Sequence, residues 1–173
     1  MAYLPAGRLE EGLVPGLTLA EHFVLAAGKG EFFVDWAAAQ DRAWERIREF
    51  GIRGRPETPV EALSGGNQQR ALLALLPPSL RLLLMEHPTR GLDVESSLWL
   101  WERLLERRQQ GTAILFSSAD LDEIFDYSDR IFVFYAGRLT RVLETSETSV
   151  QELGELIAGR GAEAAPEPRE VVR

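Results

Sequence analysis

The chain has 173 residues, of which 45% are hydrophobic, so it is long enough to bury one core or one core with a subdomain. Its net charge of −8 argues against a nucleic-acid surface, and the absence of cysteine excludes disulfides and thiolate metal sites. The two histidines, His22 and His87, are too few to favour a zinc site.

The first half of the chain predicts one short strand and then helices. The strand lies in MAYLP and is broken by Pro5 and Gly7. Thr18 is a candidate N-cap, and Pro77-Pro78 ends the last of these helices. The three expected helices span residues 17–27, 35–51 and 64–76. The apolar stripe expected on the second helix consists of Trp36, Ala39, Trp44, Ile47 and Phe50.

The second half of the chain alternates strands with helices. We expect a buried strand over residues 80–86 and a helix that Asp93 caps and that runs through Gln109. The buried face expected for that helix holds Val94, Leu98, Trp101 and Leu105. A second buried strand is expected over residues 113–118. The remaining expected elements are a short helix, a hairpin that turns at Ala136-Gly137 and a last helix, over residues 121–127, 130–144 and 150–158.

This order of elements predicts the domain organisation. Strand, helix, strand, helix, strand is typical of a partly parallel α/β sheet. The expected α/β core consists of residues 1–16 and 77–160, and an all-helical subdomain is inserted over residues 17–76. Residues 161–173 have little apolar surface to bury and are expected to form a flexible tail.

The motif LSGGNQQR, residues 63–70, predicts a phosphate-binding helix start. Ser64 supplies a hydroxyl, and Gly65 and Gly66 let the backbone approach a ligand closely. The first turn of a helix has unpaired N–H groups and carries the positive end of the helix dipole. The alternative is an ordinary serine N-cap after a turn, and a Ser-Gly-Gly sequence alone would favour that alternative.

The expected strand over residues 80–86 ends in a carboxylate, Glu86, and His87 follows it. A buried strand that ends in an acid often delivers it to a phosphate or a metal ion. His87 could in principle accept a proton, since an unperturbed imidazole titrates near pH 6.5. A general base needs a bound substrate within reach, however, and we find no segment of the sequence that would place one.

Several ordered motifs resemble the ATP-binding cassette (ABC) ATPases. LSGGNQQR resembles the signature motif of that family, and its NQQ form is similar to the second half of the duplicated subunits that drive sugar and nucleoside importers. HPTRGLDV resembles the end of the Walker B strand with the D-loop, and SSADLDEIFDYSDRIFVFYAGRL resembles the switch segment and closing hairpin. The resemblance covers about residues 2–160 and implies an incomplete P-loop NTPase (RecA-like) core with a helical subdomain. LDEIFDYSDRI and QELGELIAG favour the nucleoside branch.

Other positions depart from the family pattern. The Walker A motif G-x-x-x-x-G-K-[ST] does not occur in this sequence, and Gly28-Lys29-Gly30 lacks the earlier glycine and the hydroxyl residue. By the resemblance, Glu86 occupies the Walker B aspartate position and His87 that of the catalytic glutamate. The Q-loop glutamine corresponds to Ala6 and the switch histidine to Ala119. We therefore expect Glu86 and His87 to be a degenerate catalytic pair, with no metal site formed by the chain alone.

The resemblance also implies partners. ABC domains pair head to tail, and each ATP lies between the Walker A loop of one domain and the signature of the other. The positions expected to contact ATP and Mg²⁺ held in trans are Ser64, Gly65, Gly66, Gln68 and Asp93. The implied partners are an ABC half that carries Walker A and integral membrane permease subunits, which the helical insert would face. The implied location is the cytoplasmic side of the cell membrane, as a peripheral protein.

Three alternatives stay open at this point. The chain could be a non-functional remnant or an excerpt of a longer two-domain ATPase subunit. It could instead be an interaction module unrelated to transport, although no positive feature of the sequence favours that reading. The third alternative, an autonomous hydrolase, would need Glu86 and His87 to be catalytic.

Overall fold

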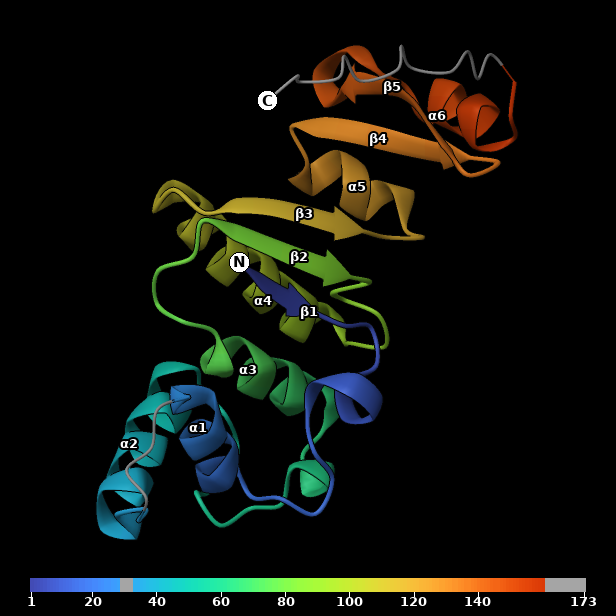
Figure 1. The fold of residues 1–173 in the computed structure, drawn as a ribbon. Helices are drawn as coiled ribbons and strands as arrows, with labels where there is room; N and C mark the ends of the chain where they lie inside the picture. Colours follow the sequence, from blue (N-terminus) through green and yellow to red (C-terminus); the bar gives the residue numbers. More distant parts are fainter. Residues whose placement is uncertain (29–32, 161–173) are drawn as a thin grey trace. The chain divides into compact units, whose positions relative to one another are not determined.

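The computed structural model describes residues 1–28 and 33–160, which form two compact units (Figure 1). The first unit is Met1–Ser117, and the second begins at Ser118. The expected tail over residues 161–173 lies outside the described residues, as do Lys29 and Gly30. None of the described helices is both long and apolar enough to cross a membrane.

The first unit contains the predicted parallel sheet. Its strands are β1 (Ala2–Leu4), β2 (Leu82–Glu86) and β3 (Ala113–Ser117), in the order β1-β2-β3, and both pairs are parallel. β2 is the central strand, with Leu83 completely buried. Because the strands are parallel, their carboxyl ends lie at the same edge of the sheet, and the loops that leave this edge are brought together.

Four α-helices accompany this sheet, and they match the predicted ones within a few residues. Thr18 begins the first of them with a capping box that includes Glu21. A five-residue π-helical turn, η1 (Arg8–Gly12), was not predicted. The helices are α1 (Leu19–Ala27), α2 (Trp36–Glu49), α3 (Gly65–Leu75) and α4 (Val94–Gln109), with a 3-10 turn η2 (Val60–Ala62) before α3. The α/β fold class expected from the sequence is confirmed.

The second unit is a hairpin packed against helices. A left-handed turn at Ala136 and Gly137 joins the antiparallel strands, as predicted. Its elements are α5 (Leu121–Tyr127), β4 (Arg130–Tyr135), β5 (Arg138–Glu144), the 3-10 turn η3 (Thr145–Glu147) and α6 (Val150–Ile157). Its apolar core consists of Ile131, Val133, Leu143, Leu153 and Leu156.

Two predicted apolar faces are wrong in part. On α4, Val94 and Leu98 are exposed, and the buried residues are Leu100, Trp101 and Leu104. Two apolar stripes overlap in this helix, and the one with Trp101 packs on the sheet, where its ring meets Phe116 edge to face at 4.8 Å. On α2 Trp36 and Trp44 are exposed. The buried residues of this helix are small or aliphatic, namely Ala39, Ala43 and Ile47.

The predicted burial of the strand over residues 113–118 is also wrong in part. No residue of β3 is fully buried, and Leu115 is 49% exposed. Within the first unit β3 pairs with β2 alone, so it is an edge strand. The sequence pattern of a buried strand does not report whether a neighbour is present on each side.

The central strand provides a stability test. Leu83→Ala should lower the free energy of unfolding by about 2–5 kcal/mol, because it removes buried methyl groups and leaves a cavity. Leu98→Ala makes the same change on a side chain that is 58% exposed and should cost less than about 0.5 kcal/mol. Urea unfolding followed by circular dichroism measures both, and equal losses would contradict the burial described here.

Candidate functional site

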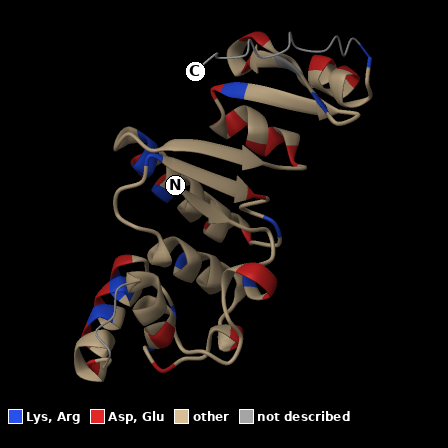
Figure 2. Ribbon diagram, in the orientation of Figure 1, with Lys and Arg blue, Asp and Glu red and all other residues tan. Residues whose placement is uncertain are grey.

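The predicted site residues lie in two places of the first unit, the turn that starts α3 and the loop that follows β2. α3 carries a single charged residue, Arg70, whereas α2 is charged along much of its length (Figure 2). The start of α3 is therefore free of side-chain charge of its own. Its electrostatic character comes from the backbone dipole and from residues on neighbouring segments.

Ser64 is the N-cap of α3, but its side chain does not cap the helix. Its hydroxyl oxygen instead accepts a hydrogen bond from Asn67 Nδ2 at 2.8 Å. Asn67 Oδ1 in turn accepts from the backbone N–H of Arg53 at 2.7 Å. The first turn thus begins without the side-chain cap that Asp93 and Thr18 provide to their helices, and a phosphate oxygen could take that place.

Gly66 brings the start of α3 against the start of α4. A Cβ atom at Gly66 would lie 2.5 Å from Ser96 Oγ and 3.9 Å from Asp93 Oδ2. A Cβ atom there would require Ser96 to shift and its hydroxyl to leave Asp93, so the close approach of the two helix starts favours glycine at the second position of the motif. The structure therefore places Gly66 of the motif beside Asp93. Ser96 was not singled out, and no sequence signal marks it.

Asp93 caps α4, and this prediction is confirmed. Its carboxylate accepts hydrogen bonds from the Ser96 backbone N–H and hydroxyl, both at 2.9 Å. Both bonds lower the pKa of Asp93 below its ordinary value, and the bond from the backbone N–H has the larger effect. The carboxylate is exposed and carries its charge at neutral pH, close to the positive end of two helices.

Gln68 points away from the exposed start of α3. Its side chain is 8% exposed, and its amide nitrogen donates to the carbonyls of Leu63 and Val60 at 3.1 and 3.3 Å. Through these two hydrogen bonds Gln68 fixes the backbone of the segment that precedes α3. A nucleotide contact by Gln68, which stays a prediction, would require the side chain to leave these acceptors.

Glu86 ends β2, and its carboxylate is exposed. The interaction with this carboxylate is the largest cause of a raised pKa for Tyr3. In the parallel register Glu86 lies opposite Ser117 of β3. In the described part of the chain no three acidic or histidine side chains gather as metal ligands do.

His87 has a left-handed backbone with φ of 43°. Its N–H donates to the Ser117 carbonyl at 2.8 Å, and its carbonyl accepts from the Arg90 N–H at 3.0 Å. These bonds close a turn over Pro88 that leads the chain from β2 to Asp93. The described role of His87 is thus conformational, and histidine is among the residues that adopt positive φ more readily than most.

Arg8 is a site residue that the sequence analysis missed. Its Nε donates to Gln69 Oε1 of α3 at 2.8 Å, and its Nη2 donates to the carbonyl of Arg90 in the loop after β2. An arginine beside a broken strand gives no sequence signal for contacts at such separations along the chain.

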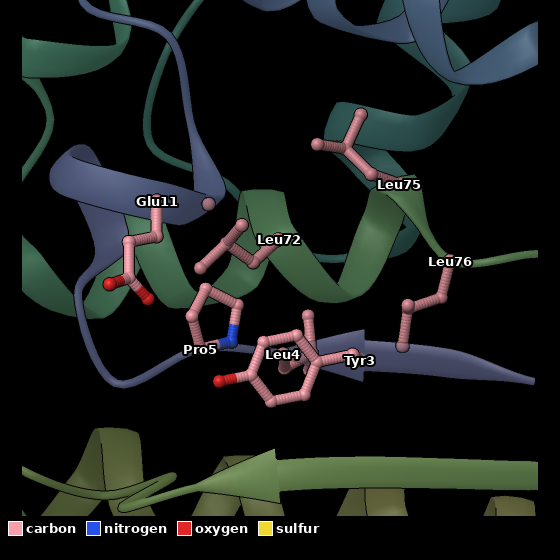
Figure 3. Close-up of a pocket in the computed structure, with 8 residues that line it drawn as sticks. Tyr3, Leu4, Pro5, Glu11, Leu72, Leu75 and Leu76 are labelled. Atoms are coloured by element: carbon pink, nitrogen blue, oxygen red, sulfur yellow. The ribbon is translucent and has the colours of Figure 1, made fainter.

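A small cavity of about 220 Å³ lies where β1, η1 and α3 meet (Figure 3). Leucine and proline side chains form most of its lining, and Tyr3 and Glu11 add polar groups at its side. The labelled lining residues are Tyr3, Leu4, Pro5, Glu11, Leu72, Leu75 and Leu76. An apolar lining with a carboxylate at one side suits a protein side chain better than a phosphate.

No protein-family model matches the chain. The chain is 36% identical over 166 residues to the nucleoside import ATP-binding protein NupA of Lactococcus lactis, a match that covers 92% of the chain and 33% of that protein. It is 34% identical over 172 residues to the ribose import ATP-binding protein RbsA 1 of Rubrobacter xylanophilus, covering 95% and 34%. The chain therefore spans about a third of the length of these curated relatives.

The fold comparison agrees. A solved ATP-binding subunit of an ABC transporter superposes with a TM-score of 0.63 at 27% identity, covering 92% of this chain and 63% of the solved one. The chain belongs to the ATP-binding cassette family, and its homologues are the ATP-binding subunits of nucleoside and sugar importers.

Proposed function

We propose that the chain serves an ABC importer of the nucleoside or sugar branch by donating its signature turn, Ser64–Gly66, to ATP held on a partner half. The observation that carries this proposal is the uncapped start of α3 beside Asp93. Backbone N–H groups and a hydroxyl face outward there, and Gly66 permits the close approach of α4. Such a helix start suits a terminal phosphate.

In this proposal the chain does not hydrolyse ATP alone. Hydrolysis needs an amide cradle for the α- and β-phosphates and a lysine for the γ-phosphate, and the 173 residues contain no Walker A motif. The backbone of His87 forms the turn that follows β2. Mg²⁺ would accompany ATP on the partner, where the phosphates supply some of its ligands. Ser64, the N–H groups of Gly65 and Gly66, and Asp93 would then face the nucleotide from this chain.

The proposed partners and location follow from the importer assignment. The Walker A loop comes from a second ABC half, and permease subunits contact the helical subdomain over residues 17–76. The cavity between β1, η1 and α3 is a candidate seat for a permease side chain, because it is apolar and carries Glu11 at its side. The protein would then be peripheral at the cytoplasmic face of the membrane.

The signature role is tested with a reconstituted pair of halves. Ser64→Arg should lower the ATPase rate of the pair by at least about a hundredfold, because it removes a donor and fills the phosphate position. Ser79→Arg introduces the same side chain in an exposed loop and should leave the rate unchanged. An unaltered rate for Ser64→Arg, with the fold intact by circular dichroism, would refute signature donation.

The dependence on a partner is tested by titrating Mg-ATP into the isolated chain. Neither heat nor a shift in melting temperature is expected, since the 173 residues contain no Walker A motif to hold the phosphates. A ligand at about 100 times its dissociation constant would stabilise the fold by roughly 2.7 kcal/mol, which a thermal melt detects. If such a shift appears and is lost in Glu86→Gln or His87→Ala, the autonomous hydrolase becomes the better reading.

The permease contact is tested at the cavity. Leu75→Glu adds a second carboxylate to the lining that already includes Glu11 and should weaken copurification with the permease by about tenfold or more, because an unpaired charge would be buried in the interface. Val150→Glu, at a 53% exposed position of the second unit, is the matched control. Equal retention of both variants would exclude the cavity as the contact.

A further inference from the structure

Arg8 begins η1, a turn that has no buried residue of its own. The turn is closed by the N–H groups of Glu11 and Gly12, which donate to the carbonyl of Gly7 at 3.1 and 3.2 Å. Its last residue, Gly12, lies against α3, because a Cβ atom added there would be 2.8 Å from Leu72 Cδ2. The hydrogen bonds of the Arg8 side chain add directional links to this packing.

The Arg8 guanidinium joins two segments that are far apart along the chain. Nε donates to Gln69 Oε1 at 2.8 Å, and Gln69 is 5% exposed on the buried side of α3. Nη2 donates to the carbonyl of Arg90, in the loop between β2 and Asp93. Because a guanidinium is planar and its donors diverge at fixed angles, the two acceptors are held in a defined relation to each other.

The third nitrogen of Arg8 lies at the signature turn. A Cβ atom at Gly65 would be 3.5 Å from Arg8 Nη1 and 3.8 Å from the carbonyl of Gly91. A cation beside the first residue of a helix is opposed by the helix dipole, and burial further lowers the pKa of Arg8. This position is thus unfavourable for the charge, and the two hydrogen bonds keep it there.

We propose that Arg8 is a positioning residue, which sets the signature turn Ser64–Gly66 against the loop Arg90–Asp93 so that both reach a nucleotide together. The proposal rests on the proposed signature donation. Arg8 acts through Gln69 and the Arg90 carbonyl. Lysine at this position would keep the charge but could not direct two donors to both acceptors in one fixed geometry.

The positioning is measured without nucleotide by electron paramagnetic resonance. The chain contains no cysteine, so Ala62→Cys and Val94→Cys can each be labelled uniquely with a nitroxide, and both positions are exposed. They report the distance between the segment before α3 and the start of α4. We expect a narrow distance distribution with Arg8 present, a broader one in Arg8→Gln and in Gln69→Leu, and only partial narrowing in Arg8→Lys.

Matched variants separate positioning from a general loss of structure. Gln69→Glu keeps an oxygen acceptor for Arg8 and should retain the narrow distribution, and the Arg8→Gln/Gln69→Leu double variant should be no broader than either single one. Arg42→Gln makes the same change on an exposed side of α2 and should have no effect. A narrow distribution in Arg8→Gln with an unchanged melting temperature would overturn the proposal.

The same variants are then assayed in the reconstituted pair. Arg8→Gln should lower kcat by about tenfold or more, since a misplacement near 1 Å is enough for such losses, and should change KM for ATP little. Gln69→Glu should keep most of the activity. If Ser64→Arg leaves the pair active, signature donation fails, while the distance measurement still decides the role of Arg8. If Arg8→Gln broadens the distance but leaves kcat intact, positioning for the reaction is refuted.

Discussion

The close approach of two helix starts is the constraint on which the candidate site depends. A Cβ atom added at Gly66 would lie 2.5 Å from Ser96 Oγ, so α3 and α4 begin within contact distance of each other. The parallel sheet makes this possible, because β2 delivers the loop that ends at Asp93 to the edge where β1 also ends. The positive ends of two helix dipoles then lie close together, and the negative charge of the nearby Asp93 carboxylate partly compensates them.

The polar side chains near this edge of the sheet mostly form hydrogen bonds that hold the backbone. Gln68 holds carbonyls before α3, Ser96 completes the cap at Asp93, and His87 extends the hydrogen bonding of β2 beyond its last residue. A surface site has little apolar packing, so these hydrogen bonds keep its loops in place instead. They leave the N–H groups at the start of α3 facing outward, and that is the chemistry a phosphate recognises.

Much of this fold could be predicted from the sequence, because the capping residues and breakers act locally. Thr18, Asp93 and Pro77 mark helix ends through their own side chains, and the predicted elements match within a few residues. The burial of faces could not be predicted so well. Leu98 and Leu100 both belong to apolar stripes of α4, and only the position of the sheet decides between them.

The candidate site shows the same division between local and distant effects. Gly65 and Gly66 predicted a close approach of the backbone to another group, and Asp93 predicted a helix cap. The inward turn of Gln68 and the reach of Arg8 to Gln69 are consequences of tertiary packing, which leaves no pattern in the sequence. A resemblance to a family located the motif, but it did not show which side chains of that motif face outward.

The pairing of β1 has a consequence for how the chain folds during synthesis. Ala2 pairs with Leu83, so the pairing of β1 with β2 cannot form until Leu83 has been synthesised. At about 5–20 residues per second, β1 waits several seconds for β2. The helices between the two strands make more local contacts and can form first. This favours a folding order in which β1 joins the sheet after the helices have formed.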